Sequence, residues 1–171
     1  MTELPHPNPL PSTSAGDNCF FALQPTSAAR EAIAQFQNAA AAKHGFKSYR
    51  VAPANLHITL LHLSQAGPAT ASILRAACDA ASSVAVAPFP LRFDRVKSCP
   101  HLSPQKPFVL CGQTDLGGAK EFQRLLGGAL REAGVPAKRS SNPHLTLFWE
   151  PPPLVAEYAI PAIGWNAHEF V

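Results

Sequence analysis

Apolar residues recur along this chain at the spacing of an α-helix in three segments. The first, Thr26–Gly45, is rich in alanine and ends on a glycine at the C-cap position. The second, Pro68–Ala81, begins with a proline, which suits the first turn of a helix. The third is predicted from a cap at Asp115 to Gly134, although two glycines inside it weaken the helix.

Short apolar or alternating runs between these segments predict β-strands. The predicted strands are Phe20–Leu23, Leu56–Leu63, Phe89–Val96, Phe108–Gly112, a strand that begins near His144 and ends at Trp149, and Ile160–Val171. Strands and helices are therefore mixed along the whole chain.

Two of these strands carry the same four-residue pattern, His57-Ile58-Thr59-Leu60 and His144-Leu145-Thr146-Leu147. In a strand, side chains point alternately to opposite faces, so each histidine shares a face with its threonine. The aliphatic residues of each pattern share the other face, which we expect to be buried. We therefore expect the four polar side chains to face a common cleft.

The surroundings of the two motifs are also repeated. His57 lies 37 positions after Phe20, and His144 lies 36 positions after Phe108. Both intervals are predicted to contain a strand, a long helix, a loop and the histidine strand. This repeat predicts two similar lobes, with the two histidine strands side by side where the lobes meet.

Composition limits the class of protein. The chain has 171 residues with 14 basic and 11 acidic side chains, a balance too mild for a dedicated nucleic-acid coat protein. Residues 1–17 are rich in proline and serine and are expected to be a flexible tail, and residues 18–171 one bilobal domain. Neither a signal peptide nor a membrane span is predicted, and the four dispersed cysteines are expected to be reduced. We expect a cytoplasmic monomer.

Histidine and threonine in this arrangement suit acid/base chemistry on a phosphate ester. Hydrolysis needs a base for the attacking water and an acid for the departing oxygen, and imidazole can serve in both roles. Threonine hydroxyls can donate to the non-bridging phosphate oxygens as charge develops on them. His57, Thr59, His144 and Thr146 are therefore the candidate catalytic residues.

The paired motifs resemble the two-histidine (2H) phosphoesterase superfamily, in the branch of bacterial 2′-5′ RNA ligases and RNA 2′,3′-cyclic phosphodiesterases. The residues that carry the resemblance are Val51, Pro53, Leu56, His57, Ile58, Thr59 and Leu60 in the first half and Pro143, His144, Leu145, Thr146 and Leu147 in the second. The resemblance implies a bilobal α+β fold and a reaction on RNA ends or 2′,3′-cyclic nucleotides without a metal or other cofactor. It also implies that His57 is the acid and His144 the base, with the roles exchanged in 2′-5′ ligation.

Some positions near the motifs differ from the family. Many members carry an arginine next to the second motif, where this chain has Asn142, Phe148 and Trp149. The basic dipeptide Lys138-Arg139 can supply positive charge, with Arg139 as a candidate phosphate ligand and a solvated surface position as the alternative. Trp149 is a candidate for stacking on a base, with packing below the strand end as the alternative.

Three other interpretations of the motifs stay open at the level of sequence. The missing arginines also fit a binding module for nucleotides or RNA that has no activity. The same site fits a small cyclic phosphate, such as a derivative of ADP-ribose. A zinc site built from His57, His144 and a third histidine lacks the usual ligand spacing.

His62 is expected to face away from His57 by strand alternation and to be structural.

Overall fold

The computed structural model describes residues 19–47, 49–63, 70–99, 106–112, 116–140, 142–150 and 154–171. The elements in chain order are β1 (Phe20–Leu23), α1 (Ser27–His44), β2 (Tyr49–Arg50), a 3₁₀ turn (Pro53–Asn55), β3 (Ile58–His62), α2 (Ala71–Ser82), β4 (Phe89–Ser98), β5 (Lys106–Cys111), α3 (Gly117–Glu132), β6 (Lys138–Arg139), β7 (Leu145–Glu150) and β8 (Tyr158–Ala167).

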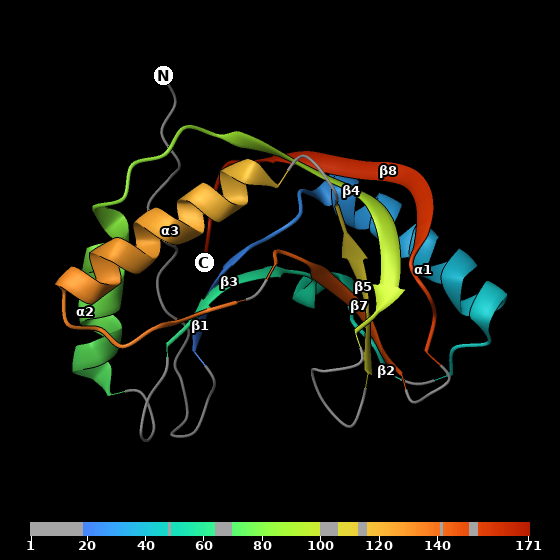
Figure 1. Cartoon of the computed structure of the whole chain (residues 1–171), viewed down its shortest axis with the longest axis horizontal. Helices are drawn as coiled ribbons and strands as arrows, with labels where there is room; N and C mark the ends of the chain where they lie inside the picture. Colours follow the sequence, from blue (N-terminus) through green and yellow to red (C-terminus); the bar gives the residue numbers. More distant parts are fainter. Residues whose placement is uncertain are drawn as a thin grey trace.

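The strands form one antiparallel sheet in the order β1-β3-β7-β5-β4-β8, with the short strands β2 and β6 paired to β7 and β3. Figure 1 shows α1 at one end of this sheet and α2 with α3 at the other. Helix α1 contacts β8, and α3 contacts β3 and β4. The α+β class is confirmed, and the two lobes share one continuous sheet.

The predicted repeat is present in three dimensions. The first half contains β1, α1, β2 and β3, and the second half contains β5, α3, β6 and β7 in the same order. Each short strand crosses to the other half, since β2 pairs with β7 and β6 pairs with β3. The two halves are thus interlocked around the central strands β3 and β7.

Two buried glutamines also connect the two halves, by hydrogen bonds from a helix of one half to the histidine strand of the other. Gln37 of α1 donates from Nε2 to the carbonyl oxygens of Val51 and Leu147, both at 3.0 Å. Gln123 of α3 donates to the carbonyl oxygens of Leu60, at 2.6 Å, and Ser140, at 3.0 Å. Each helix is therefore fixed to the histidine strand of the other half.

The helix ends follow from local chemistry. Thr26 accepts a hydrogen bond from the Ala29 amide at the start of α1, and Gly45 ends the helix with φ of 68°. Helix α2 starts at Ala71, with the Thr70 hydroxyl as its cap. The predicted proline start at Pro68 and the predicted cap at Asp115 lie outside the described residues.

The last predicted strand differs from the structure. It was expected over Ile160–Val171, but β8 runs over Tyr158–Ala167 and pairs with β4. The chain then leaves β4, and Phe170 makes an isolated bridge to Leu23 of β1. The Phe170 ring is buried at this bridge. A buried apolar residue near the end of the chain fits the strand pattern, so the sequence predicted that the strand extends to Val171.

All four cysteine side chains are partly buried. Within the described part of the chain, no helix has the length and apolar character that crossing a membrane requires.

Candidate functional site

The two histidine strands meet at the centre of the sheet. Ile58 of β3 pairs with Leu145 of β7 in antiparallel register. This register places His57 opposite Thr146, and His144 opposite Thr59. The two histidine-threonine pairs therefore lie on adjacent strands, beside the one residue pair that joins β3 to β7.

Burial separates the two faces of these strands as predicted. Ile58, Leu60, Leu145 and Leu147 are fully buried in the core. The histidines and threonines of both motifs are half-buried, so their polar ends are accessible. We call the side of the sheet that carries His57, Thr59, His144 and Thr146 the two-histidine face.

The same backbone contact orients both imidazoles. Nδ1 of His57 lies 2.7 Å from the carbonyl oxygen of Asn55, and Nδ1 of His144 lies 2.9 Å from that of Asn142. A carbonyl oxygen can only accept, so Nδ1 carries the proton and donates in each case. Nε2 is then the ring atom left for proton transfer. Both histidines are thus prepared for acid or base chemistry at the equivalent atom.

Each histidine strand contains a β-bulge at the equivalent place. On β3, Thr59 pairs with Ala22 and Leu61 with Phe21, which leaves Leu60 as the extra residue. On β7, Thr146 pairs with Val109 and Phe148 with Phe108, which leaves Leu147 as the extra residue. In both strands the extra residue is the third after the histidine. A bulge shifts every later side chain to the face opposite to the one that alternation predicts.

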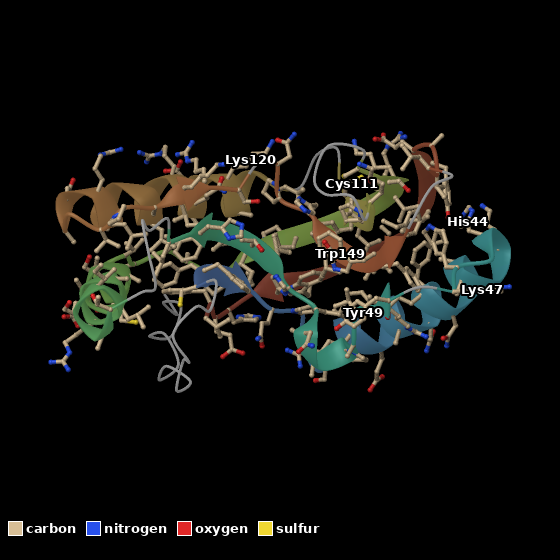
Figure 2. All side chains as sticks on the ribbon, turned by 90° about the horizontal axis from the view of Figure 1, so that it is seen from below. His44, Lys47, Tyr49, Cys111, Lys120 and Trp149 are labelled. Carbon is tan, nitrogen blue, oxygen red and sulfur yellow. The ribbon has the colours of Figure 1, made fainter. Side chains whose placement is uncertain are left out.

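Because of its bulge, β7 brings Trp149 onto the two-histidine face. Trp149 pairs with Pro107, and Thr146 pairs with Val109 two residues further along β5, so both share one face. The ring is half-buried, and its neighbour Tyr49 on β2 is 59% exposed. Figure 2 shows Trp149 near the middle of the sheet, with Tyr49 on one side of it and Cys111 on the other.

The bulge on β3 overturns the prediction for His62. His62 pairs with Phe20, and Thr59 pairs with Ala22, so His62 lies on the same face as Thr59 and His57. The Phe20 ring stacks on His57 at a centroid distance of 4.9 Å and contacts His62 at 5.9 Å. Burial, with Lys138 and then His57 nearby, lowers the pKa of His62. His62 is therefore a neighbour of the site and not a residue of the opposite face.

Arg139 does not join the other predicted site residues. It pairs with Leu61, whose partner Phe21 is buried on the core side, so Arg139 lies on the opposite face and lines a pocket beside α3. Lys138 pairs with His62 instead and lies on the two-histidine face. The basic dipeptide thus contributes its lysine and not its arginine to this face.

A pocket of about 440 Å³ opens beside His144. Leu110 pairs with Leu145 and Cys111 with Arg95, so His144, Cys111 and Arg95 lie in a row across the sheet. Lys97 and Lys120 add positive charge to this pocket, while Glu157 binds Lys97 at 2.9 Å and Arg95 at 3.5 Å. Two regions of positive charge, at Lys138 and at this pocket, therefore flank the histidines.

The thiol in this row is not a nucleophile at neutral pH. Burial raises the pKa of Cys111 to about 11, so the group stays protonated and neutral. No group of three or more His, Cys, Asp or Glu side chains among the described residues could hold a metal ion.

Sequence reasoning missed Arg95, Lys97 and Lys120, which line the pocket beside His144. Arg95 and Lys97 of β4 alternate with apolar residues. This alternation predicts a strand with one solvated face, but it does not predict that this face lies next to His144. Only the sheet order β7-β5-β4 brings that face beside His144.

Comparison with known proteins agrees with this architecture. Residues 24–170 match the family model of the 2′-5′ RNA ligase superfamily. None of the curated proteins compared with the chain matches it significantly.

Solved structures share the fold. The Thermus thermophilus protein TT0787 is 22% identical to this chain with a TM-score of 0.68, and the match covers 90% of this chain and 86% of TT0787. Apo LigT from E. coli is 24% identical with a TM-score of 0.68, and the match covers 92% of this chain and 86% of LigT. The complex of LigT with 3′-AMP matches with 24% identity and a TM-score of 0.64, over 88% of this chain and 83% of LigT. With its family match and this fold, the chain belongs to the 2′-5′ RNA ligase superfamily of 2H phosphoesterases.

Proposed function

We propose that this protein is a phosphodiesterase that opens 2′,3′-cyclic phosphates of RNA ends or nucleotides to 2′-phosphates without a metal. The observation that carries the proposal is the pair of imidazoles on one face, each with Nδ1 bound to a backbone carbonyl and Nε2 left for the reaction. The match to the superfamily and the LigT complex with 3′-AMP support a phosphate ester as substrate.

The proposed reaction uses each side chain once. Nε2 of His144 takes a proton from the attacking water, whose oxygen bonds to phosphorus. The bond from phosphorus to the ribose 3′ oxygen breaks, and protonated His57 gives its Nε2 proton to that oxygen. The hydroxyls of Thr59 and Thr146 donate to the non-bridging oxygens, where negative charge grows in the transition state.

The surroundings favour a nucleotide or an RNA end over a simple phosphate ester. Trp149, which is half-buried, and Tyr49, which is exposed, offer rings on which a base can stack. Lys138 and the pocket with Lys97 and Lys120 can bind further phosphates of the chain. Arg139 has no part in this proposal because it lies on the other face. Reversible 2′-5′ joining is compatible with the same groups, with the roles of the histidines exchanged.

The direct test is the turnover of a 2′,3′-cyclic nucleotide and of an RNA that ends in a cyclic phosphate, in excess EDTA. We expect both to be opened to 2′-phosphates at the rate seen without EDTA. Loss of activity with EDTA and its return with zinc would remove the metal-free mechanism. Binding without turnover for every cyclic phosphate tested, ADP-ribose cyclic phosphate included, would indicate a binding module. Cytoplasmic location and a monomeric state stay predictions.

A further inference from the structure

A second pocket lies on the side of the sheet opposite to the two-histidine face. It has a volume of about 910 Å³ and is open between the end of α2 and the outer side of α3. Leu61 of β3 and the glycine pair Gly127 and Gly128 of α3 belong to its lining. Arg124, Arg131 and Arg139 also line it. None of the catalytic candidates belongs to this lining.

Comparison of the two halves shows that Arg139 has lost the partners of its equivalent. Arg50 of β2 pairs with Phe148, and Arg139 of β6 pairs with Leu61, in each case the fourth residue after the histidine. Arg50 donates to Asn38, Gln37 and the Ala34 carbonyl, all on α1. The side chain of Arg139 has no hydrogen-bond or ion-pair partner among the residues that the structure describes.

The helices differ next to the buried glutamines. Because Gln37 and Gln123 are equivalent, Asn38 corresponds to Arg124. The Asn38 side chain accepts a hydrogen bond from Arg50, whereas an arginine side chain has no acceptor to offer Arg139. The second half therefore directs an unneutralised guanidinium into the pocket.

Positive charge exceeds negative charge around this pocket. Arg124 is bound by Glu121 at 2.6 Å, and Glu132 supplies the carboxylate of the lining. Arg131 and Arg139 remain, both exposed. Guanidinium groups bind phosphates in bidentate geometry, so this excess favours a phosphorylated ligand.

The glycine pair leaves the floor of the pocket bare. A Cβ on Gly128 would meet nothing within 4 Å, and a Cβ on Gly127 would only touch Leu61 at 3.8 Å. Neither glycine has a positive φ. Packing and backbone conformation therefore do not require glycine here, although glycine is less favourable than alanine inside a helix. Without side chains at these two positions, the helix backbone itself lines the pocket.

We propose that this pocket binds a nucleotide, with its base on the Gly127-Gly128 surface and its phosphates at Arg139 and Arg131. The volume is in the range of sites for small ligands, and the lining combines the small and aliphatic residues Leu61, Gly127 and Gly128 with arginines, which can bind a base and its phosphates. This site is separate from the proposed phosphodiesterase centre and does not depend on it.

Titration of the isotope-labelled protein with ADP, followed by amide NMR, tests the site. We expect shifts at Gly127, Gly128, Ala137 and Arg139. Pyrophosphate should shift Arg139 with about tenfold weaker affinity, because it lacks the base, and adenosine should bind more weakly than ADP. Equal affinities for ADP and pyrophosphate would overturn binding of the base. Shifts confined to residues around His57 and His144 would overturn the site.

Variants separate this site from the catalytic one. Arg139→Gln should weaken ADP binding at the pocket about tenfold, by loss of one charged contact. Gly128→Leu should abolish the pocket shifts by filling the floor, while a dispersed amide spectrum confirms folding. Arg75→Gln is the matched control, because it removes one exposed positive charge from α2 outside the pocket. Equal ADP binding in all three variants would overturn the proposal, whatever the phosphodiesterase assay shows.

Discussion

Gln37 of α1 and Gln123 of α3 make equivalent contacts in the two halves of the protein. Each donates to the carbonyl of the extra residue in a bulge, Leu147 or Leu60, in the histidine strand of the other half. The same two carbonyls also accept from the backbone amides of Val51 and Ser140. The glutamines thus hold the strand segment that follows each histidine, and with it the relative position of the two imidazoles.

Substitution of either glutamine should weaken the fold. Gln37→Leu and Gln123→Leu each remove two hydrogen bonds to buried carbonyls and leave at least part of that polar surface unsatisfied. We expect a loss of about 1–3 kcal/mol in the free energy of unfolding, measured by urea denaturation. Gln35→Leu, an exposed position on α1, is the control and should stay within about 0.5 kcal/mol of the wild type. An equal effect at all three positions would contradict a special role for the pair.

Removal of either imidazole should abolish most of the proposed activity. His57→Ala and His144→Ala are each expected to lower kcat for a 2′,3′-cyclic nucleotide by about 10² to 10⁴, because each deletes a proton donor or acceptor. Circular dichroism should show an intact fold, since both side chains are only half-buried. His168→Ala, at an exposed histidine, is the control. A variant that keeps nearly normal turnover would remove its histidine from the mechanism.

The two threonine hydroxyls should act in the transition state and not in binding. Thr59→Val and Thr146→Val keep the shape of the side chain but remove the donor. Each should lower kcat by about 10² with a smaller change in KM, as for other donors to a developing anion. Thr→Ser at each position should retain most of the rate. A change confined to KM would indicate ground-state binding instead.

Low pH should destabilise the folded protein through His62. Burial, Lys138 and His57 lower the pKa of His62 in the folded state, so the unfolded chain binds its proton first as pH falls. Stability should therefore decrease as pH falls through the ordinary histidine pKa of about 6.5 toward the lower folded value. His62→Gln should reduce this decrease in urea titrations at several pH values. His168→Gln should leave it unchanged, and an unaltered slope in His62→Gln would refute the assignment.

Trp149 should contribute to the binding of the base. We expect Trp149→Ala to raise KM for a cyclic nucleotide about tenfold or more, because stacking on an aromatic ring stabilises a bound base. Since the ring also packs against the core, Trp149→Phe separates the two roles by keeping an aromatic surface. That variant should recover most of the affinity. If both variants bind the nucleotide like the wild type, Trp149 serves packing alone.

Local patterns were sufficient for most of the fold. The first helix, the histidine strands, the repeat and the burial of Ile58 and Leu145 follow from periodicity, capping and alternation. They depend on residues close together in the sequence, so inspection along the chain can find them. The four polar residues of the two motifs could be named for the same reason.

Residues beyond the bulges required the tertiary structure. Alternation placed His62 away from His57, but one extra residue on β3 turns it to the same face, and the equivalent bulge turns Trp149. A bulge is decided by the register of the partner strands β1 and β5, which the local sequence does not contain. The sheet order likewise placed Lys97 beside the site and Arg139 outside it. The sequence by itself determined which groups can do the chemistry. Long-range strand pairing decided which side chains surround them, because register depends on contacts between distant segments.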